Sequence, residues 1–126
     1  MTKFIWKKKE YYLLFNANIH FAIEDKYENK SVTDILNEKG QLGLYNICWL
    51  LEKLNTQAEL LRAYEGYEKN QTLKSGELIL MLKPFEIIEA KKAIMEAVIE
   101  GYKQDEESNE EIDLGLLELQ KKTAID

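Results

Sequence analysis

The fold is decided by one apolar stretch in the middle of the chain, Leu44-Tyr-Asn-Ile-Cys-Trp-Leu-Leu51, in which only Asn46 is polar. A helix that is apolar on most of its sides must be surrounded by other elements. We therefore predict a buried central helix over residues 41–55, and we expect Gly40 to end the preceding helix in the left-handed conformation. Thr56 and Glu59 match a capping box, which predicts a further helical segment over residues 56–67.

The first 40 residues predict a β-hairpin followed by two short helices. Aromatic and β-branched residues fill positions 4–6 and 11–15, and the charged residues 7–10 between them indicate a turn. Asn16 or Asn18 can cap a helix that runs to about Tyr27. Ser31, followed three positions later by Asp34, opens a second helix with an acidic variant of the capping box.

Two elements are expected after the central region. Residues 78–82 are uniformly apolar and fit either a buried strand or a short helix, and the flanking Ser75 and Glu77 favour the helix. Pro84 suits the first turn of a last helix over residues 84–102, whose apolar side carries Ile87, Ala90, Ile94, Ala97, Val98 and Tyr102. The predicted fold class is mainly α, a compact helical domain with a short N-terminal β-hairpin.

The net charge of −6 lies entirely in the last 23 residues. Residues 1–103 hold 15 acidic and 15 basic side chains, whereas residues 104–126 hold eight acidic ones against Lys121 and Lys122. We therefore divide the chain into a helical domain, 1–103, and an acidic, flexible tail, 104–126, with a short helix near residues 110–122. Tails of this kind usually contact partners.

Composition argues against several classes of function. The longest apolar run is far shorter than the roughly 20 residues of a membrane-spanning helix, and the N-terminus lacks the apolar core of a secretory signal. A single cysteine permits no internal disulfide and fits a reducing compartment, so we expect the cytoplasm. A neutral body with an acidic tail argues against binding nucleic acid through its phosphates.

No catalytic constellation is present in the sequence, and we expect neither enzyme activity nor a cofactor or metal. His20 is the only histidine and has no cysteine or second histidine near it in the chain, so it is better interpreted as a partly exposed helix residue than as a metal ligand. Cys48 lies in the most apolar helix, where a thiol packs as a small core residue.

The candidate partner-binding residues form two groups. Tyr64 and Tyr67 lie beside Gly66 and are expected to be exposed, whereas the spacing of most other aromatic residues fits the core, namely Trp6, Tyr11, Tyr12, Phe15, Tyr45, Trp49 and Phe85. In the tail, one helical face is formed by the spacing of Ile112, Leu116 and Leu119, with Leu117 beside them. We expect apolar contacts with another protein at both groups.

Several segments carry a family resemblance. They are Tyr12-Leu-Leu-Phe-Asn-Ala-Asn-Ile19, Lys30-Ser-Val-Thr-Asp-Ile-Leu36, the long apolar helix, and Leu82-Lys-Pro-Phe-Glu-Ile-Ile88 leading to Ala97-Val-Ile-Glu-Gly101. In these patterns of residue type and order, the chain from Tyr11 to Tyr102 resembles the tail assembly chaperones of long-tailed (siphovirus-type) phages and prophages of low-GC Gram-positive bacteria.

The resemblance implies a non-catalytic, mostly helical protein that binds the aggregation-prone tape measure protein and helps load tail tube protein around it. It places this work in the cytoplasm of the bacterial host and leaves the chaperone out of the mature virion. It also implies a ribosomal frameshift near the end of the gene, for which Lys121-Lys122 is a compatible slip site. Further copies of the chain are an additional candidate partner. The alternative is a small structural subunit, such as a head–tail connector, or an acidic inhibitor of a host protein.

Overall fold

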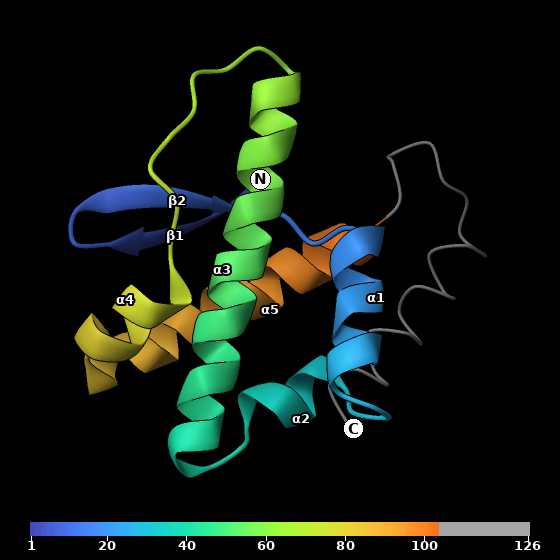
Figure 1. Ribbon diagram of the computed structural model, residues 1–126, viewed down its shortest axis with the longest axis vertical. Coiled ribbons are helices and arrows are strands. Elements are labelled where there is room, and N and C mark those ends of the chain that lie inside the picture. Colours follow the sequence, from blue (N-terminus) through green and yellow to red (C-terminus); the bar gives the residue numbers. More distant parts are fainter. Residues whose placement is uncertain (104–126) are drawn as a thin grey trace.

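The computed structural model describes residues 1–103 of the chain (Figure 1). They form a mainly helical fold with a two-stranded antiparallel hairpin at the N-terminus, as the sequence predicted. In chain order the elements are β1 (Thr2–Trp6), β2 (Lys9–Leu13), α1 (Ala17–Lys26), α2 (Val32–Leu36), α3 (Gly40–Tyr64), α4 (Ser75–Met81) and α5 (Pro84–Tyr102). The predicted acidic tail lies outside the described residues.

Helix α3 is the central element, and the other elements pack around it (Figure 1). Its middle is buried as predicted, and six of its side chains are completely inaccessible to solvent, those of Cys48, Leu50, Leu51, Leu54, Asn55 and Ala58. Tyr45 was expected in the core, but it is 46% exposed, because its neighbours Gly43, Asn46 and Ile47 form the buried side of this turn and Tyr45 lies on the opposite side.

The prediction of a separate helix after residue 55 is wrong, because α3 continues through this position without a break. Thr56 and Glu59 match a capping box only as a local pattern, and no glycine or proline interrupts residues 44–65. Glu59 is 2% exposed, and its Oε1 accepts a hydrogen bond from the backbone N–H of Asn70 at 3.0 Å. This carboxylate therefore fixes the segment that follows α3 and caps no helix.

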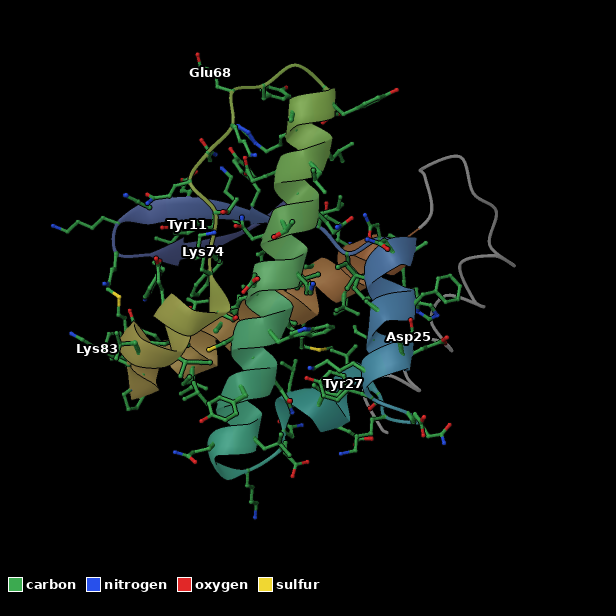
Figure 2. All side chains as sticks on the ribbon, viewed as in Figure 1. Tyr11, Asp25, Tyr27, Glu68, Lys74 and Lys83 are labelled. Carbon is green, nitrogen blue, oxygen red and sulfur yellow. The ribbon has the colours of Figure 1, made fainter. Side chains whose placement is uncertain are left out.

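Two buried asparagines of α3 hold neighbouring segments. Asn55 donates from Nδ2 to the carbonyl of Tyr12 in β2 at 2.9 Å and accepts at Oδ1 from the N–H of Leu73 at 2.7 Å. Asn46 donates to the carbonyl of Ile35 in α2 at 3.1 Å and accepts from the hydroxyl of Tyr27 at 2.8 Å. Figure 2 shows Tyr27 between α1 and α3.

The hairpin forms as predicted, with shifted bounds. Thr2 pairs with Leu13 and Trp6 with Lys9, so the strands are 2–6 and 9–13 and the turn is only Lys7 and Lys8. Their φ angles of 52° and 64° have the positive sign that a type I′ turn requires at both central residues. The inward-facing side chains of the two strands enter the core, namely Phe4, Trp6, Tyr11 and Leu13.

The predicted caps of α1 and α2 are present. Asn16 Oδ1 and Ser31 Oγ each accept a 3.1 Å hydrogen bond from a backbone N–H in the first turn of the helix that follows. Gly40 has the predicted left-handed conformation, with a φ of 73°. It lies at the start of α3, however, and α2 already ends at the C-cap residue Asn37.

The apolar run at residues 78–82 forms most of α4 and the junction behind it, so the helix favoured by the sequence is confirmed. The cap comes from α3, because the N–H of Ser75 donates to Glu52 Oε2 at 2.5 Å. Burial raises the pKa of Glu52, but the hydrogen bonds from Ser75 and the charges of Lys53 and Lys74 outweigh it and lower the pKa overall. An ionised carboxylate is favourable at a helix N-terminus.

Helix α5 has the predicted bounds and the predicted buried side. That side is formed by Ala90, Ile94, Ala97 and Val98, with Ile87 and Tyr102 partly buried at its ends. Phe85 was expected in the core, but it is 69% exposed. It precedes Ile88 by three residues and Lys92 by seven, so it shares their solvent-facing side of the helix.

Gly43 marks the place where α3 passes closest to the turn that follows α2. A Cβ built on Gly43 would overlap the backbone carbonyl of Glu38, whereas a Cβ built on Gly76 in α4 meets nothing within 4 Å. We predict that Gly43→Ala lowers the free energy of unfolding by about 2 kcal/mol, because the turn must move. Gly76→Ala should leave it unchanged or raise it. Chemical denaturation followed by circular dichroism measures both, and equal stabilities would contradict the close approach.

Candidate functional site

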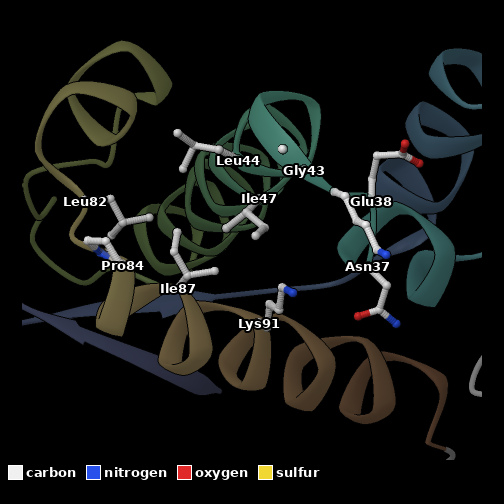
Figure 3. A pocket seen from close by; sticks show the side chains of 11 residues that line it. Asn37, Glu38, Gly43, Leu44, Ile47, Leu82, Pro84, Ile87 and Lys91 are labelled. Atoms are coloured by element: carbon white, nitrogen blue, oxygen red, sulfur yellow. The ribbon is translucent and has the colours of Figure 1, made fainter.

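A groove of about 450 Å³ opens where the N-terminal end of α3 meets the junction of α4 and α5 (Figure 3). The turn between α2 and α3, residues 37–40, forms its polar wall. Figure 3 shows side chains of α3 facing those of the junction and of α5 across the opening. Its apolar lining comes from three separate segments and consists of Leu44, Ile47, Leu82, Pro84 and Ile87.

Local geometry aims these side chains into the groove. Leu44 and Ile47 are three residues apart on α3, and Ile87 and Lys91 are four apart on α5, so each pair shares a helix face. Pro84 disfavours helical geometry at the residue before it, and Lys83 is extended, with φ of −88° and ψ of 154°. The chain therefore turns between α4 and α5, which leaves Leu82 at the edge of the groove.

The charge along the groove is positive and unbalanced. Lys39 and Lys91 line it, and neither forms an ion pair within residues 1–103, whereas Glu38 pairs with Lys30 at 3.9 Å. The N-terminus of α3 adds to this charge, because no side chain caps it and its first turn holds no acidic residue. A long helix carries roughly half a positive charge at this end. The groove thus combines an apolar floor with a positive rim.

Exposed apolar side chains are concentrated in the same part of the chain. Phe85 and Ile88, which adjoin the lining residues Pro84 and Ile87 in sequence, are each 69% exposed. Leu80, near the end of α4, is 84% exposed. Large apolar groups gathered at the surface mark a site that contacts another chain or a ligand. This region therefore has the character of a docking surface.

The structure places Tyr64 and Tyr67 at the other end of α3. They are 90% and 62% exposed, so their predicted exposure is confirmed, and their role in binding stays a prediction. The ring centroids of Tyr67 and Tyr12 lie 5.1 and 4.5 Å from the Arg62 guanidinium carbon, and the three residues line a second hollow. The 25 residues of α3 span about 37 Å, so these tyrosines do not join the groove.

The tail candidates Ile112, Leu116, Leu117 and Leu119 lie outside the described residues, and their role also stays a prediction. Sequence reasoning missed the groove, because its lining comes from segments that meet only in the folded chain. One signal was available. Residues 78–88 hold more large apolar side chains than one buried helix face can cover, so some of them had to face outward.

His20 is a partly exposed residue of α1, as predicted, and it contacts α5. Its Nδ1 lies 2.9 Å from the hydroxyl oxygen of Tyr102, and its Nε2 lies 3.1 Å from Glu24 Oε1. The two ring nitrogens thus contact one partner within α1 and one in α5. Burial, and then the charge of Glu24, raises the pKa of Tyr102.

Within residues 1–103, no three His, Cys, Asp or Glu side chains gather as a metal site would require. None of the helices in this range combines the length and apolar character that crossing a membrane demands. Comparison of the chain with models of protein families, with curated proteins and with solved structures gives no match. The case for a function therefore depends on the groove and on the chemistry of the residues that form it.

Cys48 is completely buried in α3, and burial raises the pKa of its thiol to about 11. Because the thiolate is the reactive form, we predict that a thiol reagent leaves Cys48 unmodified in the folded protein at about pH 8. The same reagent should modify it fully after denaturation. Equal rates in the two states would contradict a closed core around α3.

The same shift predicts how stability depends on pH. The folded pKa lies above the ordinary value of 9.0, so the unfolded chain loses the thiol proton first as pH rises. The free energy of unfolding of the wild type should therefore fall more steeply than that of Cys48→Ala between pH 9.0 and about 11. Parallel pH dependences of the two proteins would argue against the raised pKa.

Proposed function

We propose that the chain is a non-catalytic tail assembly chaperone of a long-tailed phage or prophage and that it binds the tape measure protein through the groove. It helps to recruit tail tube subunits in the cytoplasm of the bacterial host and stays out of the mature virion. The observation that carries the proposal is the apolar groove, whose lining residues Pro84 and Ile87 adjoin the exposed Phe85 and Ile88 in sequence. The resemblance of the chain from Tyr11 to Tyr102 to tail assembly chaperones indicates which kind of partner the groove binds.

The groove suits the expected chemistry of that partner. A tape measure protein presents long apolar helices, and an amphipathic helix binds a groove through side chains at positions i, i+3 or i+4, and i+7. Leu44, Ile47 and Ile87 offer an apolar floor for such side chains. The exposed Ile88 adjoins this floor, because it lies four residues after Pro84 and three before Lys91 on α5. Burying one exposed side chain of this size contributes roughly 1.5–3 kcal/mol. A few such contacts are enough for a specific complex.

Ile88→Asp tests the contact without disturbing the core. The side chain is 69% exposed, and Leu60 on α3, at 58%, offers a matched aliphatic control. We predict that Ile88→Asp weakens binding to the co-expressed tape measure protein by at least about tenfold, which corresponds to ~1.4 kcal/mol. Leu60→Asp should bind as the wild type does. Quantitative co-purification measures binding, and thermal melts of both variants should match the wild type.

Two results would contradict the proposal. Unchanged binding by Ile88→Asp, or an equal loss in both variants, would remove the groove from the contact. Stoichiometric amounts of the chain in purified virions would favour a structural subunit, such as a connector, over an assembly chaperone.

A further inference from the structure

We propose that the groove also binds a segment of this same chain, the acidic leucine-rich stretch Ile112-Asp-Leu-Gly-Leu-Leu-Glu-Leu119. This contact forms within the isolated protein and depends on no partner. It joins two features that the proposed function leaves unused, namely the unbalanced positive charge along the groove and the acidic composition of residues 104–126.

The apolar chemistry of the segment matches the floor of the groove. Five of its eight residues are aliphatic, namely Ile112, Leu114, Leu116, Leu117 and Leu119. The groove offers aliphatic side chains from three elements and a volume of about 450 Å³. That volume falls in the range of pockets that enclose a compact apolar ligand.

The negative charge of this segment makes it a better ligand for the groove than an uncharged apolar peptide. Residues 104–119 hold seven acidic side chains and no basic one. Lys39 and Lys91 line the groove without an ion pair in residues 1–103, and the N-terminus of α3 has no capping side chain. A carboxylate such as that of Asp113 or Glu118 can accept from the free N–H groups of that terminus and face its positive dipole end. The segment thus supplies the partners that the groove lacks.

The connection is long enough for this contact. Helix α5 ends at Tyr102, 11 residues beyond Lys91, which is about 16 Å along the helix axis. The eight residues 104–111 reach about 27 Å when fully extended. Ile112 can therefore lie beside Lys91, and the following residues can continue along the floor.

Tethering makes even a weak contact effective. A short linker gives an effective concentration of about 1 mM. A segment that binds with a dissociation constant of about 0.1 mM then fills the groove in roughly nine of ten molecules. The chain would cover its own apolar surface in this way, and any other occupant of the groove would have to displace residues 112–119.

Methyl NMR spectra of the full-length protein test the contact. The readout is the methyl resonances of Ile47 and Ile87 in the groove, with Ile5 on the outer face of the hairpin as the internal reference. We expect Leu116→Asp/Leu117→Asp to shift the two groove resonances and leave that of Ile5 in place. The control Ala124→Asp adds a tail charge outside the segment and should shift none of them. Adding a synthetic peptide of residues 104–126 to the double variant should reverse the shifts.

Charge reversal and dilution complete the test. Lys39→Glu/Lys91→Glu, which alters solvent-accessible side chains at the rim, should reduce the effect of the tail substitutions on Ile87. The wild-type spectrum should not change on tenfold dilution, because the contact lies within one chain. The proposal would be overturned if the leucine substitutions left the methyl resonances of Ile47 and Ile87 unshifted. Resonances that move on dilution would also overturn it, because the occupant would then be a second copy of the chain.

Discussion

The arrangement of this molecule depends on the side-chain amide of Asn55, which is completely buried in the middle of α3. Its two ends bond to backbone groups of two different segments, the carbonyl of Tyr12 and the N–H of Leu73. Leaving a buried backbone group without its partner costs roughly 1–3 kcal/mol, so the hairpin and the segment before α4 have one favourable position along α3. That segment leads directly into α4, whose end forms one wall of the groove.

Asn46 fixes the opposite wall of the groove, also through hydrogen bonds of a buried side-chain amide. Its amide holds the carbonyl of Ile35 near the end of α2, and the turn after α2 forms the polar side of the groove. Gly43 permits that turn to approach α3 closely. Both walls are therefore attached to α3 through buried amides, while the floor is simply the apolar face of α3 and α5. A groove built in this way keeps its shape although its lining side chains come from distant parts of the chain.

The sequence predicted the elements whose signals are local. The bounds of α5 follow from Pro84 and a regular apolar stripe, and the caps at Asn16 and Ser31 follow from short hydrogen-bonding patterns. The predictions from sequence failed where a residue in a local pattern binds a partner that is distant in the sequence. The capping box at Thr56 and Glu59 was misleading because Glu59 binds the backbone at Asn70. The groove and the exposed Phe85 were missed because hydrophobicity alone does not say which apolar residues of a surplus face outward.

The central claim is that one groove takes an apolar chain segment, first the protein's own and then the partner's. Photo-crosslinking from p-benzoylphenylalanine in place of Asn37, an exposed lining residue of the groove, tests it most directly, and a second variant carries the same label in place of Tyr64 at the far end of α3. With the purified protein alone, the label at position 37 should capture residues 112–119 of the same chain, and after addition of the tape measure protein it should capture that protein. Capture from position 64 and none from position 37, with or without the partner, would contradict the account.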